Sequence, residues 1–228
     1  MVTGASRGIG LAVAQGLVAI GLRVALVARS ADALAQRAKS LGHGAFACPC
    51  DLTSADSVGT ALSTIHTALG VPDLLVSCAG VFPLASVENT SGDDFAAALQ
   101  ANLVGPFRLL HALAPAMRGR GRGHIVTVGS VADRTAYPEN AAYAASKFGA
   151  RAVHEVLREE MRGSGVRTTL ISPGPVNTSL WDSIDPDTRP GFTRRADMLA
   201  PQDVSDAVIW AVTRPAHVNV DELRLTRA

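Results

Sequence analysis

Short apolar runs rich in Val, Ile, Leu and Ala alternate along the chain with longer segments whose apolar residues recur at helical spacing. The short runs predict strands and the longer segments predict helices. The expected strands are Arg23–Ala28, Ala45–Cys50, Leu74–Ser77, His124–Val128, Arg167–Ile171 and Glu222–Leu225. The expected helices are Ile9–Ile20, Ala31–Leu41, Ala55–Leu69, Asp93–Met117, Ala142–Arg162 and Pro201–Val212.

This alternation is typical of βαβ units and predicts an α/β fold, a doubly wound Rossmann-type parallel sheet in three α/β/α layers. The 228 residues suit one domain spanning residues 1–228. A segment of about 178–200 has no strong period, so it is either a lid over a substrate or a plain surface loop. Only Met1–Thr3 are available for a first strand, so that strand is stunted or the natural start lies upstream.

Composition narrows the class of protein. Hydrophobic residues make up 47% of the chain and the net charge is +1, which favours neither disorder nor nucleic acid or an anionic membrane as partner. No run of 18 apolar residues predicts a membrane span. Three cysteines suit buried thiols in a reducing cytoplasm better than disulfides, and neither they nor the histidines show metal-ligand spacing.

A glycine-rich turn opens the chain between the first strand and the first helix. Glycine permits a tight turn and close approach of backbone to a phosphate, and the helix that follows offers free N–H groups to an anion. Glycines in tight turns are often only structural, but the strand–turn–helix context favours a nucleotide. The residues expected to contact a dinucleotide here are Gly4, Ser6, Arg7, Gly8, Ile9 and Gly10.

The residue after the second strand is Arg29. An acid often binds the ribose 2′-hydroxyl of NAD at this place, whereas an arginine attracts a 2′-phosphate. Arg7 can reach the same region, so we expect NADP(H) as the preferred cofactor, with NAD(H) as the alternative. The competing interpretation is a pair of solvated surface arginines.

Further cofactor contacts are expected where later strands end. Asp51, followed by Leu52, either accepts a hydrogen bond from the adenine amino group or caps the next helix. The small residues Cys78, Ala79 and Gly80 would let the adenine ribose lie close to the backbone. After the sixth strand, Pro173, Gly174 and Val176 can reach the nicotinamide carboxamide through the backbone, and Thr178 can bond the phosphates.

A separate constellation suggests proton transfer. Tyr143 and Lys147 lie four residues apart on one predicted helix, so an ammonium sits near a phenol. A nearby positive charge favours phenolate, so the tyrosine can act as general acid in reduction and base in oxidation. Ser130, 13 residues earlier, can hydrogen-bond the substrate oxygen. Without Ser130, Tyr143 and Lys147 would be interpreted as incidental residues on the surface of an ordinary helix.

Asn102 precedes Gly105-Pro106 within the fourth predicted helix. Proline removes a backbone hydrogen bond and kinks the preceding turn, which frees a carbonyl to bind water and link Lys147 to solvent. Taken alone, Asn102 is an incidental polar residue.

Together these residues resemble the short-chain dehydrogenase/reductase family, in its Tyr-x-x-x-Lys branch, over nearly the whole chain. The cofactor turn, Asp51 and Pro173-Gly174 match its motifs. The resemblance implies a catalytic tetrad of Asn102, Ser130, Tyr143 and Lys147, with Tyr143 as acid/base, Lys147 on the ribose hydroxyls and Asn102 holding a relay water. It also implies a homodimer or homotetramer. Cys78 departs from the asparagine usual there, which puts local rigidity in doubt.

We therefore expect an NADP(H)-dependent oxidoreductase that transfers hydride between nicotinamide and a small carbonyl or alcohol substrate. The nearest alternatives are a 3-oxoacyl-thioester reductase, for which Arg189, Arg194 and Arg195 would supply a basic patch near the lid, and a catalytically idle NADP-binding sensor.

Overall fold

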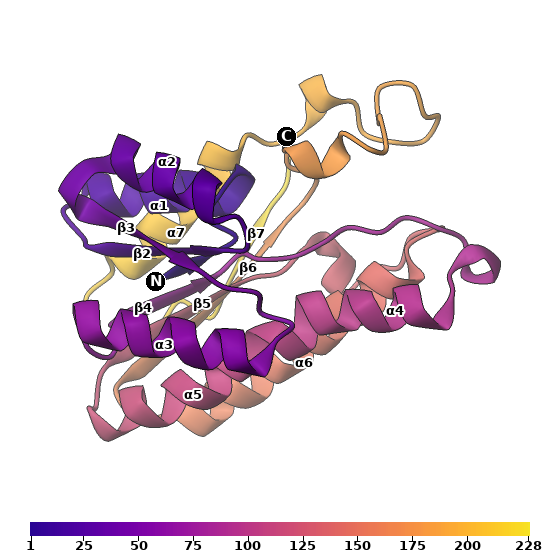
Figure 1. The fold of residues 1–228 in the computed structure, drawn as a ribbon. Coiled ribbons are helices and arrows are strands. Elements are labelled where there is room, and N and C mark those ends of the chain that lie inside the picture. The colour runs from indigo at the N-terminus through magenta and orange to yellow at the C-terminus, as the bar shows by residue number, and fades with distance from the viewer.

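Seven parallel strands form one sheet in the order β3-β2-β1-β4-β5-β6-β7 in the computed structural model, which describes residues 1–228 (Figure 1). Strands β1 and β4 lie at the centre. Strands β2 and β3 extend the sheet on the side of β1, and β5, β6 and β7 extend it on the side of β4. This is the doubly wound arrangement that the sequence predicted. The strands are β1 (Val2–Thr3), β2 (Val24–Ala28), β3 (Ala45–Pro49), β4 (Leu74–Ser77), β5 (Gly123–Val128), β6 (Val166–Pro173) and β7 (Glu222–Leu225).

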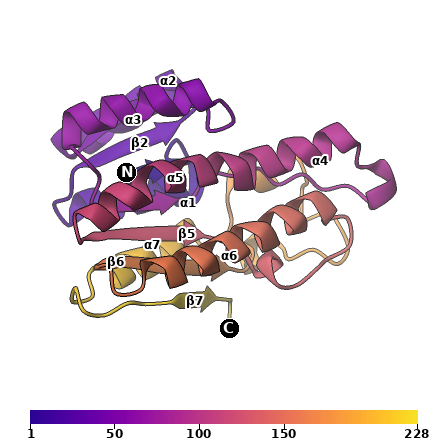
Figure 2. The same cartoon turned by 90° about the horizontal axis from the view of Figure 1, so that it is seen from below.

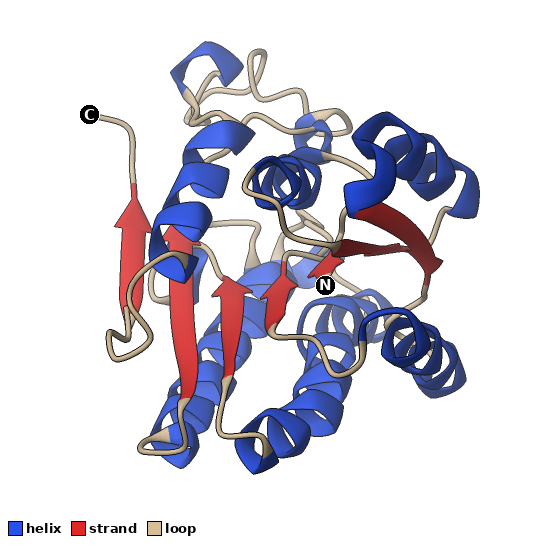
Figure 3. Ribbon diagram, turned by 90° about the vertical axis from the view of Figure 1, so that its left-hand side faces the viewer, coloured by secondary structure: helices blue, strands red, loops and turns tan.

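Helices cover both faces of the sheet (Figures 1 and 3). One face packs against α1 (Gly8–Ala19), α2 (Ala31–Leu41) and α7 (Pro201–Val212). The other face packs against α3 (Ala55–Leu69), α5 (Gly105–Gly119) and α6 (Ala141–Met161), which lie side by side in Figure 2. The short helix α4 (Gly92–Leu99) leads into α5.

Alternating side chains of each strand supply the two cores. In β2, Val24 and Leu26 point into the core beneath α1 and α7, whereas Ala25 and Val27 point into the core beneath α3, α5 and α6. Successive side chains of a strand face opposite sides of a sheet, so a strand that is apolar at every position must be covered on both faces. The near-continuous apolar runs of the sequence thus dictate the three layers.

One predicted helix is wrong as a single element. The expected helix Asp93–Met117 is divided into α4 and α5 by a π-helical turn over Gln100–Val104. Pro106 has no N–H to donate to the carbonyl of Asn102, four residues earlier, so the regular ladder cannot continue through this point. The other predicted elements lie within two residues of the observed ones.

No helix of the chain is long and apolar enough to cross a membrane. All three cysteines are free, and no cluster of three or more His, Cys, Asp or Glu side chains is arranged to hold a metal ion.

Two buried histidines lie between the sheet and α6. His124 on β5 shares a hydrogen bond of 2.8 Å with the hydroxyl of Thr169, and His154 on α6 shares one of 2.9 Å with the hydroxyl of Thr127. Burial lowers the pKa of His124 to about 3, with Arg167 adding to the shift, and lowers the pKa of His154 to about 4. Both imidazoles are therefore neutral in the folded protein at pH 7.

We expect the free energy of unfolding to decrease as pH falls from about 6.5 towards 4. In this pH range the two histidines bind protons in the unfolded chain, where their pKa is near 6.5, but stay neutral in the folded chain. Each histidine therefore lowers the free energy of unfolding by about 1.4 kcal/mol per pH unit. Urea unfolding at a series of pH values measures this dependence. His154→Gln should flatten it, whereas substitution of the exposed His217 should not; an unchanged slope in His154→Gln would contradict the assignment.

Candidate active site

The glycine turn is shaped by contacts that leave no room for side chains. Gly4 has a φ of +67°, and a Cβ there would lie 3.0 Å from the backbone of Ala79. A Cβ on Gly10 would lie 2.4 Å from the carbonyl oxygen of Gly4. The backbone of the turn thus folds onto the start of α1, which leaves its outer side as an open cradle for a phosphate group.

The start of α1 suits an anion. Its N-cap, Arg7, makes no side-chain capping bond, and its first turn contains no acidic residue. Thr178 comes close to this place, because a Cβ on Gly8 would lie 3.3 Å from its methyl group. The structure therefore brings together the two segments expected to hold the phosphates, the turn and the residues after β6.

Two arginines flank the expected adenosine side. Arg29 is exposed after β2, and its charge contributes to lowering the pKa of the nearby Asp51, after the larger effect of hydrogen bonds from Thr53. Arg37, on α2, donates from Nε to the carbonyl oxygen of Ser6 at 3.3 Å. Sequence reasoning missed Arg37, since an arginine in mid-helix carries no motif.

The capping role considered for Asp51 belongs to another residue. Ser54 caps α3 by accepting from the N–H of Ser57, while Oδ1 of Asp51 accepts from the N–H and hydroxyl of Thr53. The side chain of Leu52 is buried in the core, so a contact between Leu52 and a cofactor would have to use its main chain.

Thr3 is a second residue that sequence reasoning missed. Its hydroxyl accepts hydrogen bonds from the N–H groups of Cys78 and Ala79 at 3.0 and 3.1 Å. This pair of bonds ties β1 to the loop after β4. It fastens the segment that was expected to be less rigid because Cys78 lacks an amide side chain.

The predicted catalytic residues approach one another from two elements. Ser130 follows β5, and its Oγ accepts from the N–H of Ala132 at 3.1 Å, which leaves its O–H free to donate. Tyr143 lies in the first turn of α6, with Nζ of Lys147 5.6 Å from its ring centroid. The buried Lys147 donates to the carbonyl oxygen of Val128 at 3.1 Å. Lys147 thus joins α6 to the end of β5.

Asn102 lies behind this group rather than in the cavity. Its Oδ1 accepts from the N–H of Val81 at 2.7 Å, and its Nδ2 donates to the carbonyl of Val81 and the hydroxyl of Ser146. The side chain is thus fully occupied. Only the Asn102 carbonyl, which loses its regular partner at Pro106, is available for the water expected there.

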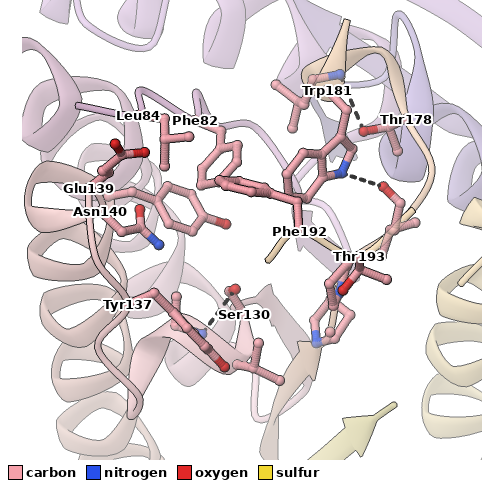
Figure 4. A pocket seen from close by; sticks show the side chains of 18 of the residues that line it. Phe82, Leu84, Ser130, Tyr137, Glu139, Asn140, Thr178, Trp181, Phe192 and Thr193 are labelled. Carbon is pink, nitrogen blue, oxygen red and sulfur yellow. Dashed lines mark hydrogen bonds between the residues drawn. The ribbon is translucent and has the colours of Figure 1, made fainter. Parts of the chain in front are cut away.

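A cavity of about 700 Å³ opens beside Ser130 and Tyr143. Ile9 and the backbone from Pro173 to Val176 line one side of it. Residues from the 178–200 segment, which was expected to be a lid or a surface loop and is called the lid segment below, line the other side, with Trp181 and Phe192 turned toward Phe82 (Figure 4). Nε1 of Trp181 donates to the carbonyl of Val176 at 3.0 Å, which holds the indole in place.

An ion-pair network supports the Ser130 loop from behind. Asp133, which is fully buried, bonds to Arg134 at 2.7 Å and accepts from the hydroxyl of Ser172 at 2.5 Å. Arg134 also pairs with Glu222 at 2.5 Å. The network links the loop after β5 to the ends of β6 and β7, and its side chains compensate one another's charge.

The sequence model described as short chain dehydrogenase matches residues 1–189. The chain belongs to the short-chain dehydrogenase family. It is an oxidoreductase of that family, and its Rossmann-type sheet is the one its structural relatives share.

The chain is 37% identical to glycine betaine reductase ATRR of Emericella nidulans over 98% of its own length, but it spans only 18% of that reductase. It is 32% identical to an uncharacterised oxidoreductase of Staphylococcus haemolyticus, covering 98% of this chain and 94% of the relative.

Solved structures agree. An alcohol dehydrogenase from the archaeon Thermococcus sibiricus, complexed with 5-hydroxy-NADP, superposes with a TM-score of 0.89 at 30% identity, covering 100% of this chain and 95% of that one. The closed form of a serine dehydrogenase with NADP⁺ gives 0.90 at 28% identity, covering 98% and 92%.

We expect Gly10→Ala to weaken NADPH binding at least tenfold and to destabilise the fold by about 1–3 kcal/mol, because the added methyl would overlap the Gly4 carbonyl. Calorimetry and thermal unfolding measure the two effects. Gly59→Ala, in α3 with open space around it, is the matched control and should stabilise the protein by about 0.5–1 kcal/mol. Equal NADPH affinity in Gly10→Ala and wild type would contradict the hypothesis that the glycine turn binds the phosphates of the cofactor.

Proposed function

We propose that the protein is an NADP(H)-dependent oxidoreductase that interconverts a carbonyl and an alcohol, with Tyr143 as general acid and base. The observation that carries this proposal is that Ser130 and Tyr143 line the same cavity as Ile9 and the Pro173–Val176 backbone. A reactive oxygen beside the two hydroxyls would therefore lie next to the expected nicotinamide side. When bound, the cofactor supplies or accepts the hydride.

The two hydroxyls suit different tasks. The O–H of Ser130 is free to donate to the substrate oxygen, because its Oγ already accepts from Ala132. The phenol of Tyr143 makes no hydrogen bond to another protein group, so it is free to give its proton to that oxygen in reduction and to recover it in oxidation. The buried ammonium of Lys147 lies 5.6 Å from the centroid of the Tyr143 ring, so a positive charge stays close to the phenol during the proton transfer.

The remaining residues of the proposed tetrad act at a distance from the cavity. Lys147 uses one N–H on Val128, which leaves others for the ribose hydroxyls. Asn102 holds the loop of Val81 in place through two hydrogen bonds, and its carbonyl is the proposed site of a relay water.

NADP(H) is the proposed preference over NAD(H). Arg29 makes no ion pair and is exposed at the end of β2, the strand that pairs with β1, and Arg37 bonds to the carbonyl of Ser6 in the glycine turn. Two cations at these positions provide charge-assisted donors for a 2′-phosphate. Structural relatives complexed with NADP forms support the same choice.

The thioester-reductase alternative is less well supported. It would require free cations near the lid segment for a phosphorylated carrier. Each candidate instead pairs with an acid, Arg189 with Glu139, Arg194 with Asp197 and Arg195 with Asp182, at 2.7–2.8 Å. The idle-sensor alternative does not explain why Ser130 and Tyr143 line the same cavity.

A homodimer or homotetramer through α5 and α6 remains part of the proposal. Phe107 on α5 and Phe148 on α6 are both nearly half exposed, at 48% and 44%. Large apolar side chains exposed on neighbouring helices suit burial against a second copy.

Tyr143→Phe should lower carbonyl-dependent NADPH oxidation by about 10³-fold or more, because the ring remains but its proton is lost. Loss of absorbance at the nicotinamide wavelength over a panel of ketones and aldehydes measures the rate. The control is Tyr137→Phe, a tyrosine of the cavity rim outside the tetrad, which should keep measurable turnover. NADPH binding without turnover of any carbonyl by wild type would favour the idle sensor.

Arg29→Asp should shift the ratio of kcat/KM values towards NADH by about tenfold or more, since the carboxylate repels a 2′-phosphate and accepts from a 2′-hydroxyl. Arg162→Asp, an exposed charge reversal at the far end of α6, is the matched control and should leave the ratio unchanged. An unaltered ratio in Arg29→Asp would remove Arg29 from the cofactor site.

A further inference from the structure

The substrate side of the cavity is built from aromatic rings in series. Phe82 lies edge-on to Tyr143 at 4.7 Å and to Trp181 at 5.0 Å, and Trp181 lies edge-on to Phe192 at 6.4 Å. The series thus runs from Tyr143, the proposed proton donor, to the lid segment; Figure 4 shows Phe82, Trp181 and Phe192 close together at the cavity. Aromatic walls favour a flat or large apolar group by area of contact and by edge-to-face geometry.

Only two residues that line the cavity are charged, and they neutralise each other. Arg189 of the lid segment pairs with Glu139, which precedes α6, at 2.8 Å. The guanidinium also lies 4.8 Å from the ring centroid of Phe192. A substrate carboxylate would therefore meet no unpaired cation in the cavity, and it would compete with Glu139 for Arg189.

The main chain of Glu139 is held in a constrained conformation. Glu139 immediately precedes Asn140, the N-cap of α6. Its backbone occupies the left-handed region, with a φ of +60°, and its carbonyl accepts from the N–H of Ala85 at 2.9 Å. A non-glycine residue keeps this conformation only when its surroundings hold it there, so the main chain of Glu139 is fixed beside the cavity.

The other polar side chains that line the cavity are uncharged. Asn140 is 6% exposed and lines the cavity, and its Oδ1 has no hydrogen-bond partner in the protein. A buried amide oxygen accepts from an O–H or N–H donor, so Asn140 can orient an uncharged substrate that carries such a donor. The wall thus offers apolar rings, uncharged polar groups and one ion pair.

We propose that the pocket selects uncharged carbonyl substrates bearing an aromatic ring or a similarly large apolar group, and that Glu139 excludes carboxylate-bearing substrates by neutralising Arg189. This inference rests on the proposed function. It gives Glu139 a role in specificity, since exclusion here comes from an occupied cation rather than from a clash.

The test compares methyl benzoylformate with benzoylformate, which share an aryl ketone and differ in one negative charge. Wild type should reduce the ketone of the methyl ester with a kcat/KM about 100-fold or more above its kcat/KM for the ketone of the acid. Glu139→Gln, which frees Arg189, should lower this ratio by about tenfold or more. Glu159→Gln, which breaks an exposed ion pair with Arg162 elsewhere on α6, is the matched control and should leave the ratio unchanged. Adding Arg189→Gln to Glu139→Gln should restore the preference for the ester.

Binding provides a readout that does not depend on turnover. Trp181 and Trp210 are the two tryptophans of the chain, and Trp210 lies outside the cavity, stacked on Arg214. In a Trp210→Phe background with NADP⁺ present, quenching of Trp181 should report ester binding, and acid binding should become measurable only when Glu139 is replaced. Quenching selective for the ester without reduction of any carbonyl would overturn the proposed function but support the selectivity. Reduction of the acid as efficiently as the ester by wild type would overturn the selectivity alone.

Discussion

The geometry of the site depends on the hydrogen bond that the buried ammonium of Lys147 donates to the main chain. The ammonium lies between α6 and the end of β5 and donates to the carbonyl of Val128. A buried charge is costly without hydrogen bonds, so this contact requires α6 to be docked on the sheet in one position. That position sets Tyr143, one turn earlier, at the cavity wall, while the network of Asp133, Arg134 and Ser172 holds the Ser130 loop opposite.

Local patterns were sufficient to predict the architecture. Strands β2, β3 and β4 are apolar at nearly every position because helices cover both faces of the sheet, and this distinguishes them from half-exposed strands. The glycine turn could be recognised because it joins two successive elements, and the Ser130–Tyr143–Lys147 spacing because it runs only from the end of β5 into the next helix, α6. The same locality explains why these segments meet, since the carboxyl ends of parallel strands share an edge.

Features that depend on distant parts of the chain could not be predicted. The π-helical turn at Gln100–Val104 leaves the apolar period almost intact, so periodicity could not separate α4 from α5. The bonds of Thr3 to the loop after β4, of Arg37 to Ser6 and of Glu139 to Arg189 join residues 31 to 76 positions apart. No spacing rule relates such pairs, and only the folded chain shows that the lid segment brings a cation to an acid at the cavity rim.

Isotopic labelling most directly tests whether the protein transfers hydride between a nicotinamide and a carbonyl carbon. An aryl ketone is incubated with the protein and NADPH deuterated on one face of C4, and the alcohol is analysed by mass spectrometry and NMR. We expect deuterium bonded to the former carbonyl carbon from one of the two C4 epimers and none from the other. An alcohol formed without deuterium from either epimer, or cofactor oxidised without any alcohol, would contradict this hydride transfer.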